Sequence, residues 1–275
     1  MPHQTAKIRL HLDAGRDAGP DVGPDGGDGK AWSVGTTLPV SREQAHYLLR
    51  VMRLQPGARV RAFTGTEGEW LAEIAEAAKR EATLRLIERL RAPTLPPDLW
   101  LCFAPIKKAR TDFIVEKAVE LGCRRIRPVL TRNTNAERVR TDRLAAHAVE
   151  AAEQCGLVYV PEIAEPVTLD VLLDRWPDGR RLMICDERAA GFGRTDPADL
   201  PAAAEALRGA GAGDPGDAGW AVICGPEGGF SDAEAARLAA MPGAVAVSLG
   251  PRVLRADTAA VAAIALWQSV LGDWR

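Results

Sequence analysis

The 275 residues of this chain show two different patterns of apolar and polar positions. In the first third, Ser41 and Gln44 form a capping box that predicts the start of a helix, and Pro56-Gly57 predicts its end. Three strand-like runs follow at residues 59–64, 69–76 and 83–90. We therefore predict a small antiparallel β unit of barrel or sandwich type.

The second pattern begins after residues 92–97, where three prolines prevent a helix or strand from continuing. The strands expected beyond this point are residues 99–104, 126–130, 181–185, 220–224 and 244–249. The expected helices are residues 111–121, 141–155, 168–176, 231–240 and 257–271. This alternation predicts an α/β domain with a parallel sheet over residues 98–275. A linker at 93–97 separates it from a first domain of residues 1–92.

Two stretches have almost nothing to bury. Residues 13–30 and 209–219 are rich in Gly, Asp and Pro, which predicts loops, the first of them a flexible insertion. The last expected helix is the opposite case, because it is apolar almost all round. One face of a sheet cannot cover such a helix alone, so we predict that a second copy of the chain covers it in a homodimer.

Composition narrows the class of protein. Apolar residues make up 47% of the chain and charged residues 26%, which is typical of a soluble globular protein. No apolar run reaches the roughly 18 residues that a membrane helix needs, and the first residues do not resemble a signal peptide. We therefore expect a cytoplasmic protein. Its five cysteines lack metal-binding spacing, so we expect buried thiols and neither disulfides nor zinc.

The net charge of −2 conceals an uneven distribution. Residues 101–143 carry eleven Lys and Arg against five Asp and Glu, and residues 41–61 carry five arginines against one glutamate. Such segments can hold a polyanion locally, because salt limits charge effects to about 10 Å at 0.1 M. Solvated helix faces explain the same charges equally well, so charge alone does not decide between the two.

Three loops after expected strands are the candidates for chemistry, at residues 185–188, 225–230 and 249–258. Ligands bind at the carboxyl ends of parallel strands, where such loops converge. The glycines in these loops allow the backbone to approach a ligand closely. The loop 225–230 matches neither GxxxxGK[ST] nor GxGxxG, which argues against a nucleotide-phosphate or dinucleotide site.

Two of these loops resemble the C-terminal motifs of a known family. The similar strings are Gly225-Pro226-Glu227-Gly228-Gly229-Phe230-Ser231 and, after Leu249-Gly250, Arg252-Val253-Leu254-Arg255-Ala256-Asp257-Thr258-Ala259. The family is that of the 16S ribosomal RNA uridine-N3 methyltransferases, the small subunit methyltransferase E family of the SPOUT superfamily. Further similarity at residues 46–57, 107–122 and 150–155 extends the resemblance over nearly the whole chain. Leu157 and Val158 depart from the pattern, since the family often has an arginine there, and Asp257 stands where Glu is common.

The resemblance implies a fold and an activity. The C-terminal domain would carry a deep trefoil knot, which general rules of topology would not predict. A PUA-like RNA-binding β-barrel domain would precede it. The activity would be methyl transfer from S-adenosylmethionine to N3 of a uridine in 16S rRNA of the small ribosomal subunit, during rRNA processing and ribosome biogenesis. The family acts as a homodimer, and no metal is implied.

The resemblance also implies roles for particular residues. Arg255 is expected to stabilise charge on the uracil oxygens, and Glu227 to hold the cofactor or act as the base. The sequence does not identify the general base. Arg255 could instead form an ion pair with Asp257 or Glu227. Glu227 could serve only to place negative charge before the helix that begins at Ser231. Cofactor contacts are expected from Asp186, Gly225, Pro226, Glu227, Gly228, Leu249, Gly250, Val253, Leu254 and Thr258. RNA contacts are expected from Arg50, Arg53, Lys107, Lys108, Arg110 and Arg132.

Three other functions fit parts of the pattern. They are a SPOUT enzyme that methylates a different RNA atom, a non-catalytic RNA-binding assembly factor, and a nucleotide-dependent enzyme. The matches at residues 46–53 and 107–122 argue against the first of these. The intact glycines and Arg255 argue against the second, and the missing Lys-Ser/Thr pair argues against the third.

Overall fold

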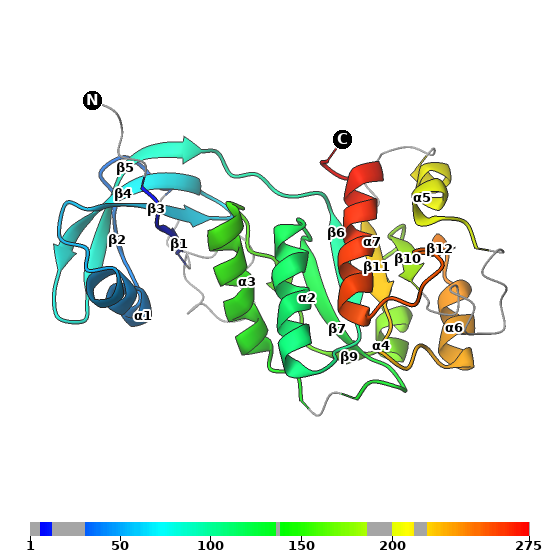
Figure 1. Ribbon diagram of the computed structural model, residues 1–275. Helices are drawn as coiled ribbons and strands as arrows, with labels where there is room; N and C mark the ends of the chain where they lie inside the picture. The colour runs from blue at the N-terminus through cyan, green and yellow to red at the C-terminus, as the bar shows by residue number, and fades with distance from the viewer. Residues whose placement is uncertain (1–5, 13–30, 136–137, 186–199, 212–218, 275) are drawn as a thin grey trace. The chain divides into compact units, whose positions relative to one another are not determined.

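The computed structural model describes residues 6–12, 31–135, 138–185, 200–211 and 219–274. The chain divides into two compact units, each with its own sheet and core (Figure 1). The first unit comprises Met1–Leu95 and Ala152–Val160, and the second comprises Pro96–Ala151 and Pro161–Arg275. The insertion expected at 13–30 lies outside the described residues, as does Asp186.

The first unit contains a five-stranded sheet in the order β1-β3-β4-β5-β2. Its strands are β1 Arg9–His11, β2 Thr37–Pro39, β3 Arg59–Thr64, β4 Gly68–Ala77 and β5 Ala82–Arg91. The three predicted strands form its antiparallel centre, β3-β4-β5. The prediction missed β1 and β2, because three residues are too few to show alternation. The prediction of a purely antiparallel unit was wrong, since β1 pairs with β3 in parallel.

A short helix covers the buried face of this sheet. The predicted capping box is confirmed: the Ser41 hydroxyl accepts a hydrogen bond from the Gln44 amide, and the Gln44 side chain accepts one from the Ser41 amide. Helix α1, Arg42–His46, continues as a π-helix, η1, Tyr47–Val51. The helical segment therefore ends at Val51, earlier than Pro56-Gly57 suggested. Arg53 follows at φ 54°, in the left-handed region that non-glycine residues seldom adopt.

A buried carboxylate ties the first unit together. Glu69 is fully buried on β4, and its oxygens accept hydrogen bonds from Arg9 at 2.6 Å and Arg91 at 3.0 Å. Burial raises the pKa of Glu69, but the hydrogen bonds from Arg91 and Arg9 outweigh it, so this pKa lies below its ordinary value. Arg9 also donates to the carbonyl oxygens of Ala152, Glu153 and Leu157. These bonds explain why residues 152–160 belong to the first unit.

The second unit contains a sheet in the order β12-β10-β11-β6-β7-β8, with β9 beside β7. Its strands are β6 Leu99–Phe103, β7 Arg125–Leu130, β8 Glu162–Ile163, β9 Val167–Thr168, β10 Arg181–Cys185, β11 Trp220–Cys224 and β12 Ala244–Val247. Every one of these pairings is parallel, which confirms the predicted α/β fold. The register places Cys185 beside both Cys224 and Val247, so β10, β11 and β12 end at one edge.

Helices connect these strands. They are α2 Lys108–Glu120, α3 Thr141–Cys155, α4 Leu169–Asp174, α5 Ala203–Gly211, α6 Asp232–Ala239 and α7 Ala256–Val270. Ser231 and Glu234 form a second capping box, before α6. Helix α2 begins three residues before the predicted Thr111. Helix α5 was not predicted, and the loop expected from Gly209 was wrong up to Gly211; residues 212–218 lie outside the described part.

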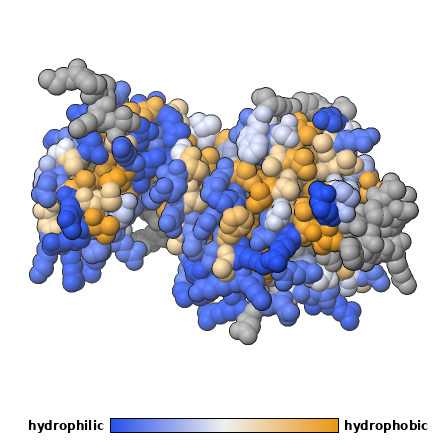
Figure 2. Space-filling model, viewed as in Figure 1, coloured by the Kyte–Doolittle hydropathy of each residue, from blue (hydrophilic) through white to orange (hydrophobic). Residues whose placement is uncertain are grey.

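The terminal helix α7 packs against α2, α5 and β11. Its buried side consists of Ala256, Ala260, Ala263, Ile264, Trp267 and Gln268. Apolar residues on its other sides, such as Val261 and Leu266, are only half-buried. Figure 2 shows apolar residues gathered on the face over α2 and α7. Within the described residues, no helix combines the length and apolar character needed to cross a membrane.

Candidate active site

A cavity of about 260 Å³ opens at the edge of the second sheet where β10 and β11 end. Two of the three loops singled out from the sequence form most of it, because their strands, β11 and β12, flank β10 and end at the same edge of the sheet. The first is the loop after β11, at residues 225–230. The second runs from Leu249, after β12, into the first turn of α7. Parallel topology thus assembles this cavity from segments far apart in sequence.

The loop after β11 is shaped by its glycines. A Cβ on Gly225 would lie 3.0 Å from the ring of Phe230, and Gly229 has φ 66°. The side-chain amide of Asn133 donates to the carbonyl oxygens of Gly228 and Gly229 at 3.1 and 3.0 Å. The loop is therefore fixed from both sides, by its own turn and by the segment that follows β7.

The loop before α7 has an apolar surface and a cationic end. Gly250 has φ 112°, and its amide donates to the Ser248 hydroxyl at 3.2 Å. Val253 is 45% exposed although it is apolar, so it offers surface to a ligand in the cavity. Arg255 is the N-cap residue of α7 and makes no side-chain capping bond. It has no ion-pair partner among the described residues.

Arg110, from the first turn of α2, neutralises the carboxylates at the rim of the cavity. Its Nη1 atom lies 2.7 Å from Glu227 Oε1, and its Nε atom lies 3.7 Å from Asp257 Oδ2. The sequence had suggested Arg255 for these two carboxylates, and Arg110 for RNA. The structure instead gives the ion pairs to Arg110 and leaves Arg255 free of them within the described residues. Arg110 thereby links α2, the loop after β11 and the first turn of α7.

Most expected site residues meet in this cavity. Those that line it are Gly225, Pro226, Glu227, Leu249, Gly250, Val253, Leu254 and Arg255. Gly228 and Thr258 are in the same loops but do not line the cavity, and Asp186 lies outside the described residues. Sequence reasoning did not single out Cys185, Cys224, Phe230, Arg252, Ala256 and Ala259, which also line it. Their only sequence signal is their position at the ends of the strands or within the motif loops.

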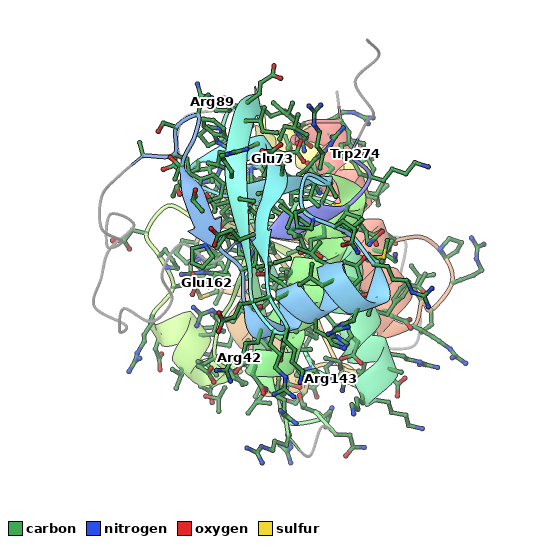
Figure 3. All side chains as sticks on the ribbon, turned by 90° about the vertical axis from the view of Figure 1, so that its left-hand side faces the viewer. Arg42, Glu73, Arg89, Arg143, Glu162 and Trp274 are labelled. Atoms are coloured by element: carbon green, nitrogen blue, oxygen red, sulfur yellow. The ribbon has the colours of Figure 1, made fainter. Side chains whose placement is uncertain are left out.

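The expected RNA contacts fall on both units. Arg50 lies on η1 and Arg53 two residues after its end, both exposed in the first unit. In the second unit, Lys107 and Lys108 line a separate cavity, and Arg132 is exposed after β7. Arg143 lines the same separate cavity and was not predicted; it projects from the first turn of α3 (Figure 3).

The cavity fits the cofactor that the resemblance implies. S-Adenosylmethionine combines an aromatic base with a charged amino-acid tail. Leu249, Val253 and Leu254 supply apolar surface for a base, while Glu227 and Arg255 supply charge at the rim. The glycines keep side chains away from the walls and leave backbone polar groups accessible.

Comparisons with known proteins agree with this geometry. A family model described as an RNA methyltransferase domain matches residues 93–268, and one described as an RNA methyltransferase PUA domain matches residues 40–87. Ribosomal RNA small subunit methyltransferase E of Rickettsia conorii is 31% identical, over 82% of this chain and 86% of its own. The Synechocystis protein of the same name is 29% identical, over 86% of this chain and 75% of its own.

Solved structures share the fold. One is the Neisseria gonorrhoeae methyltransferase E bound to S-adenosyl methionine, with a TM-score of 0.76 and 24% identity, covering 98% of this chain and 99% of that one. Another is a putative methyltransferase from Legionella pneumophila in complex with the bound cofactor. It has a TM-score of 0.75 and 26% identity, and covers 97% of this chain and 98% of that one.

Proposed function

Because this chain belongs to the RNA methyltransferase family, we propose that it transfers a methyl group from S-adenosylmethionine to N3 of a uridine in small-subunit ribosomal RNA. One observation carries the proposal: two loops, from the strands on either side of β10, meet in one cavity that has glycines in its walls. At its rim lies Arg255, which has no ion-pair partner in the described part of the chain. The names of the relatives from Rickettsia and Synechocystis support small-subunit rRNA as the substrate.

The cavity residues would hold the cofactor in place. Val253 and Leu254 would pack against the adenine, and the backbone of residues 225–228 and 249–254 would hydrogen-bond its polar groups. When bound, the cofactor supplies a methyl group that its sulfonium has already activated. The main task of the protein is then to place the uridine N3 in line with that group.

Uridine N3 carries a proton at neutral pH, so its negative charge must be stabilised as the proton leaves. Arg255 is suited to this because no carboxylate among the described residues competes for its guanidinium. Glu227 is less suited to be the base, since accepting a proton would break its 2.7 Å ion pair with Arg110. We therefore assign charge stabilisation to Arg255 and a positioning role to Glu227, and the N3 proton passes to solvent water.

Three further properties belong to the proposal. The PUA-like domain, residues 1–92, would bind RNA through Arg50 and Arg53, with 93–97 as the linker to the catalytic domain. A second copy of the chain would cover the half-buried apolar residues of α7. An enzyme that acts on the small ribosomal subunit would work in the cytoplasm.

The test is methyl transfer from labelled S-adenosylmethionine to small ribosomal subunits from cells that lack this modification, followed by identification of the product nucleoside. We expect 3-methyluridine. Arg255→Ala should lower the rate at least 100-fold, as expected when a group that stabilises transition-state charge is removed, while cofactor affinity stays within threefold. A different methylated nucleoside would refute the uridine-N3 assignment. Cofactor binding without any transfer, or no cofactor binding at all, would favour an RNA-binding assembly factor.

A further inference from the structure

A second cavity, of about 390 Å³, lies in the same unit and is strongly basic. Its lining includes five cations, Lys107, Lys108, Arg138, Arg140 and Arg143, and one carboxylate, Asp112. The first two cations precede and open α2, Arg138 and Arg140 directly precede α3, and Arg143 lies in the first turn of α3. Figure 2 shows hydrophilic residues gathered below α2 and α3 in that view.

Most of this positive charge is available to a ligand. Asp112 is buried and forms an ion pair with Arg143, so these two charges offset each other. Among the described residues, Arg140 pairs with Asp142 alone, and both side chains are more than 60% exposed, which makes that pair weak. Lys107, Lys108 and Arg138 have no ion-pair partner among the described residues. Four cations therefore remain to balance an external anion.

The first turn of α2 separates this cavity from the candidate active site. The Thr111 hydroxyl accepts a hydrogen bond from the Ile106 amide and donates one to the Ile106 carbonyl, both at 3.0 Å. This exchange fixes the loop after β6 to the helix. On the same turn, Lys108 and Thr111 line the basic cavity, while Arg110 binds Glu227 at the rim of the other. One rigid turn thus sets the spacing between the two cavities.

We propose that the basic cavity binds the phosphodiester backbone of the RNA beside the target nucleotide, an inference that rests on the proposed function. Arginine forks and lysine point charges both suit phosphate oxygens. Backbone contacts of this kind fix the register of a nucleic acid without reading its sequence. A strand held here is anchored across the first turn of α2 from the active site, so its next nucleotide can enter that site.

The test replaces the two most exposed arginines, Arg138→Gln together with Arg140→Gln. Arg143 is left in place because its removal would leave the buried Asp112 without its arginine partner. The matched control, Arg175→Gln with Arg208→Gln, removes the same charge from exposed residues near the ends of α4 and α5. Affinity for small ribosomal subunits is measured between 50 and 200 mM salt, and cofactor affinity separately.

We expect the cavity variant to bind the subunit about tenfold more weakly at low salt. The slope of log affinity against log salt should fall by roughly 0.7 to 0.9 for each phosphate that the variant no longer binds. Its kcat/KM should fall in parallel, with cofactor affinity and the control variant unchanged. An unaltered salt slope would overturn the proposal. It would also be overturned if the cavity variant bound an acidic peptide more weakly than the wild type while its affinity for RNA was unchanged. Failure of the proposed function would be seen separately, as wild-type protein that forms no 3-methyluridine.

Discussion

At the scale of single residues, Arg110 has the most consequential contacts of the candidate site. It holds two carboxylates that belong to different elements, the loop after β11 and the first turn of α7. Removing the guanidinium would leave these carboxylates facing each other without a counter-charge. The loop after β11 and the first turn of α7 would then no longer be linked to α2 by the Arg110 ion pairs.

We predict that Arg110→Gln weakens S-adenosylmethionine binding about tenfold, equivalent to about 1.4 kcal/mol. The loss is smaller than for a buried charged hydrogen bond because Glu227 is about half exposed. Calorimetric titration measures it. Lys117→Gln, which breaks the Lys117–Glu120 pair near the other end of α2, serves as control. Unchanged cofactor affinity with weakened RNA binding would instead make Arg110 an RNA contact.

Glu69 carries a second residue-scale prediction, on the pH dependence of stability. Its pKa in the folded protein lies below the ordinary 4.5. The carboxylate therefore contributes stability that is fully present above about pH 4.5 and is lost as pH falls through the folded pKa. Glu69→Gln should destabilise the first unit by about 3 kcal/mol at pH 7, because it leaves the largely buried Arg9 guanidinium without its carboxylate.

Hydrogen exchange of the β3 and β4 peptides, corrected for the intrinsic rate at each pH, measures this difference. The gap between wild type and variant should narrow as pH falls below 4.5. The control is Glu73→Gln on the same strand (Figure 3), because Glu73 pairs with the exposed Arg85. A gap of equal size at every pH would show that Glu69 acts through packing and not through its charge.

At the scale of elements, local signals predicted the structure well wherever a physical cue was strong. Capping boxes at Ser41 and Ser231 fixed the starts of α1 and α6, because each places a hydroxyl on a free amide three residues later. The buried strands β10 and β11 were found with their bounds, since their apolar runs end at polar or glycine residues. β1 and β2 escaped because three residues show no period, and their pairing depends on distant strands.

The candidate site shows the same division. Its glycine loops carry a recognisable motif, so the sequence predicted that they would line a site. The pairing of Arg110 with Glu227 and Asp257 could not be predicted, because these residues are more than one hundred positions apart. The basic cavity was only half predicted, since Arg138, Arg140 and Arg143 join Lys107 and Lys108 only after β6 and β7 pair.

At the scale of the whole molecule, the half-buried side of α7 bears on oligomeric state. We predict that the protein sediments with the mass of two chains and that Leu266→Glu shifts it toward one, since a charge there would be desolvated in the interface. Ser269→Glu, at an exposed position of the same helix, is the matched control and should leave the mass unchanged. A wild-type mass of one chain would refute the proposed dimer.

The hydrogen bonds between residues 152–160 and the rest of the first unit can form only late in the synthesis of the chain. Arg91, at the end of the last strand of that unit, donates to the carbonyl oxygen of Gly156, 65 positions later. At roughly 5 to 20 residues per second, translation needs about 3 to 13 seconds to cover that distance. During this interval the nascent β1, β3, β4 and β5 lack the carbonyl partners of Arg9 and Arg91. The first unit is therefore completed only after residues 96–151 of the second unit have been synthesised.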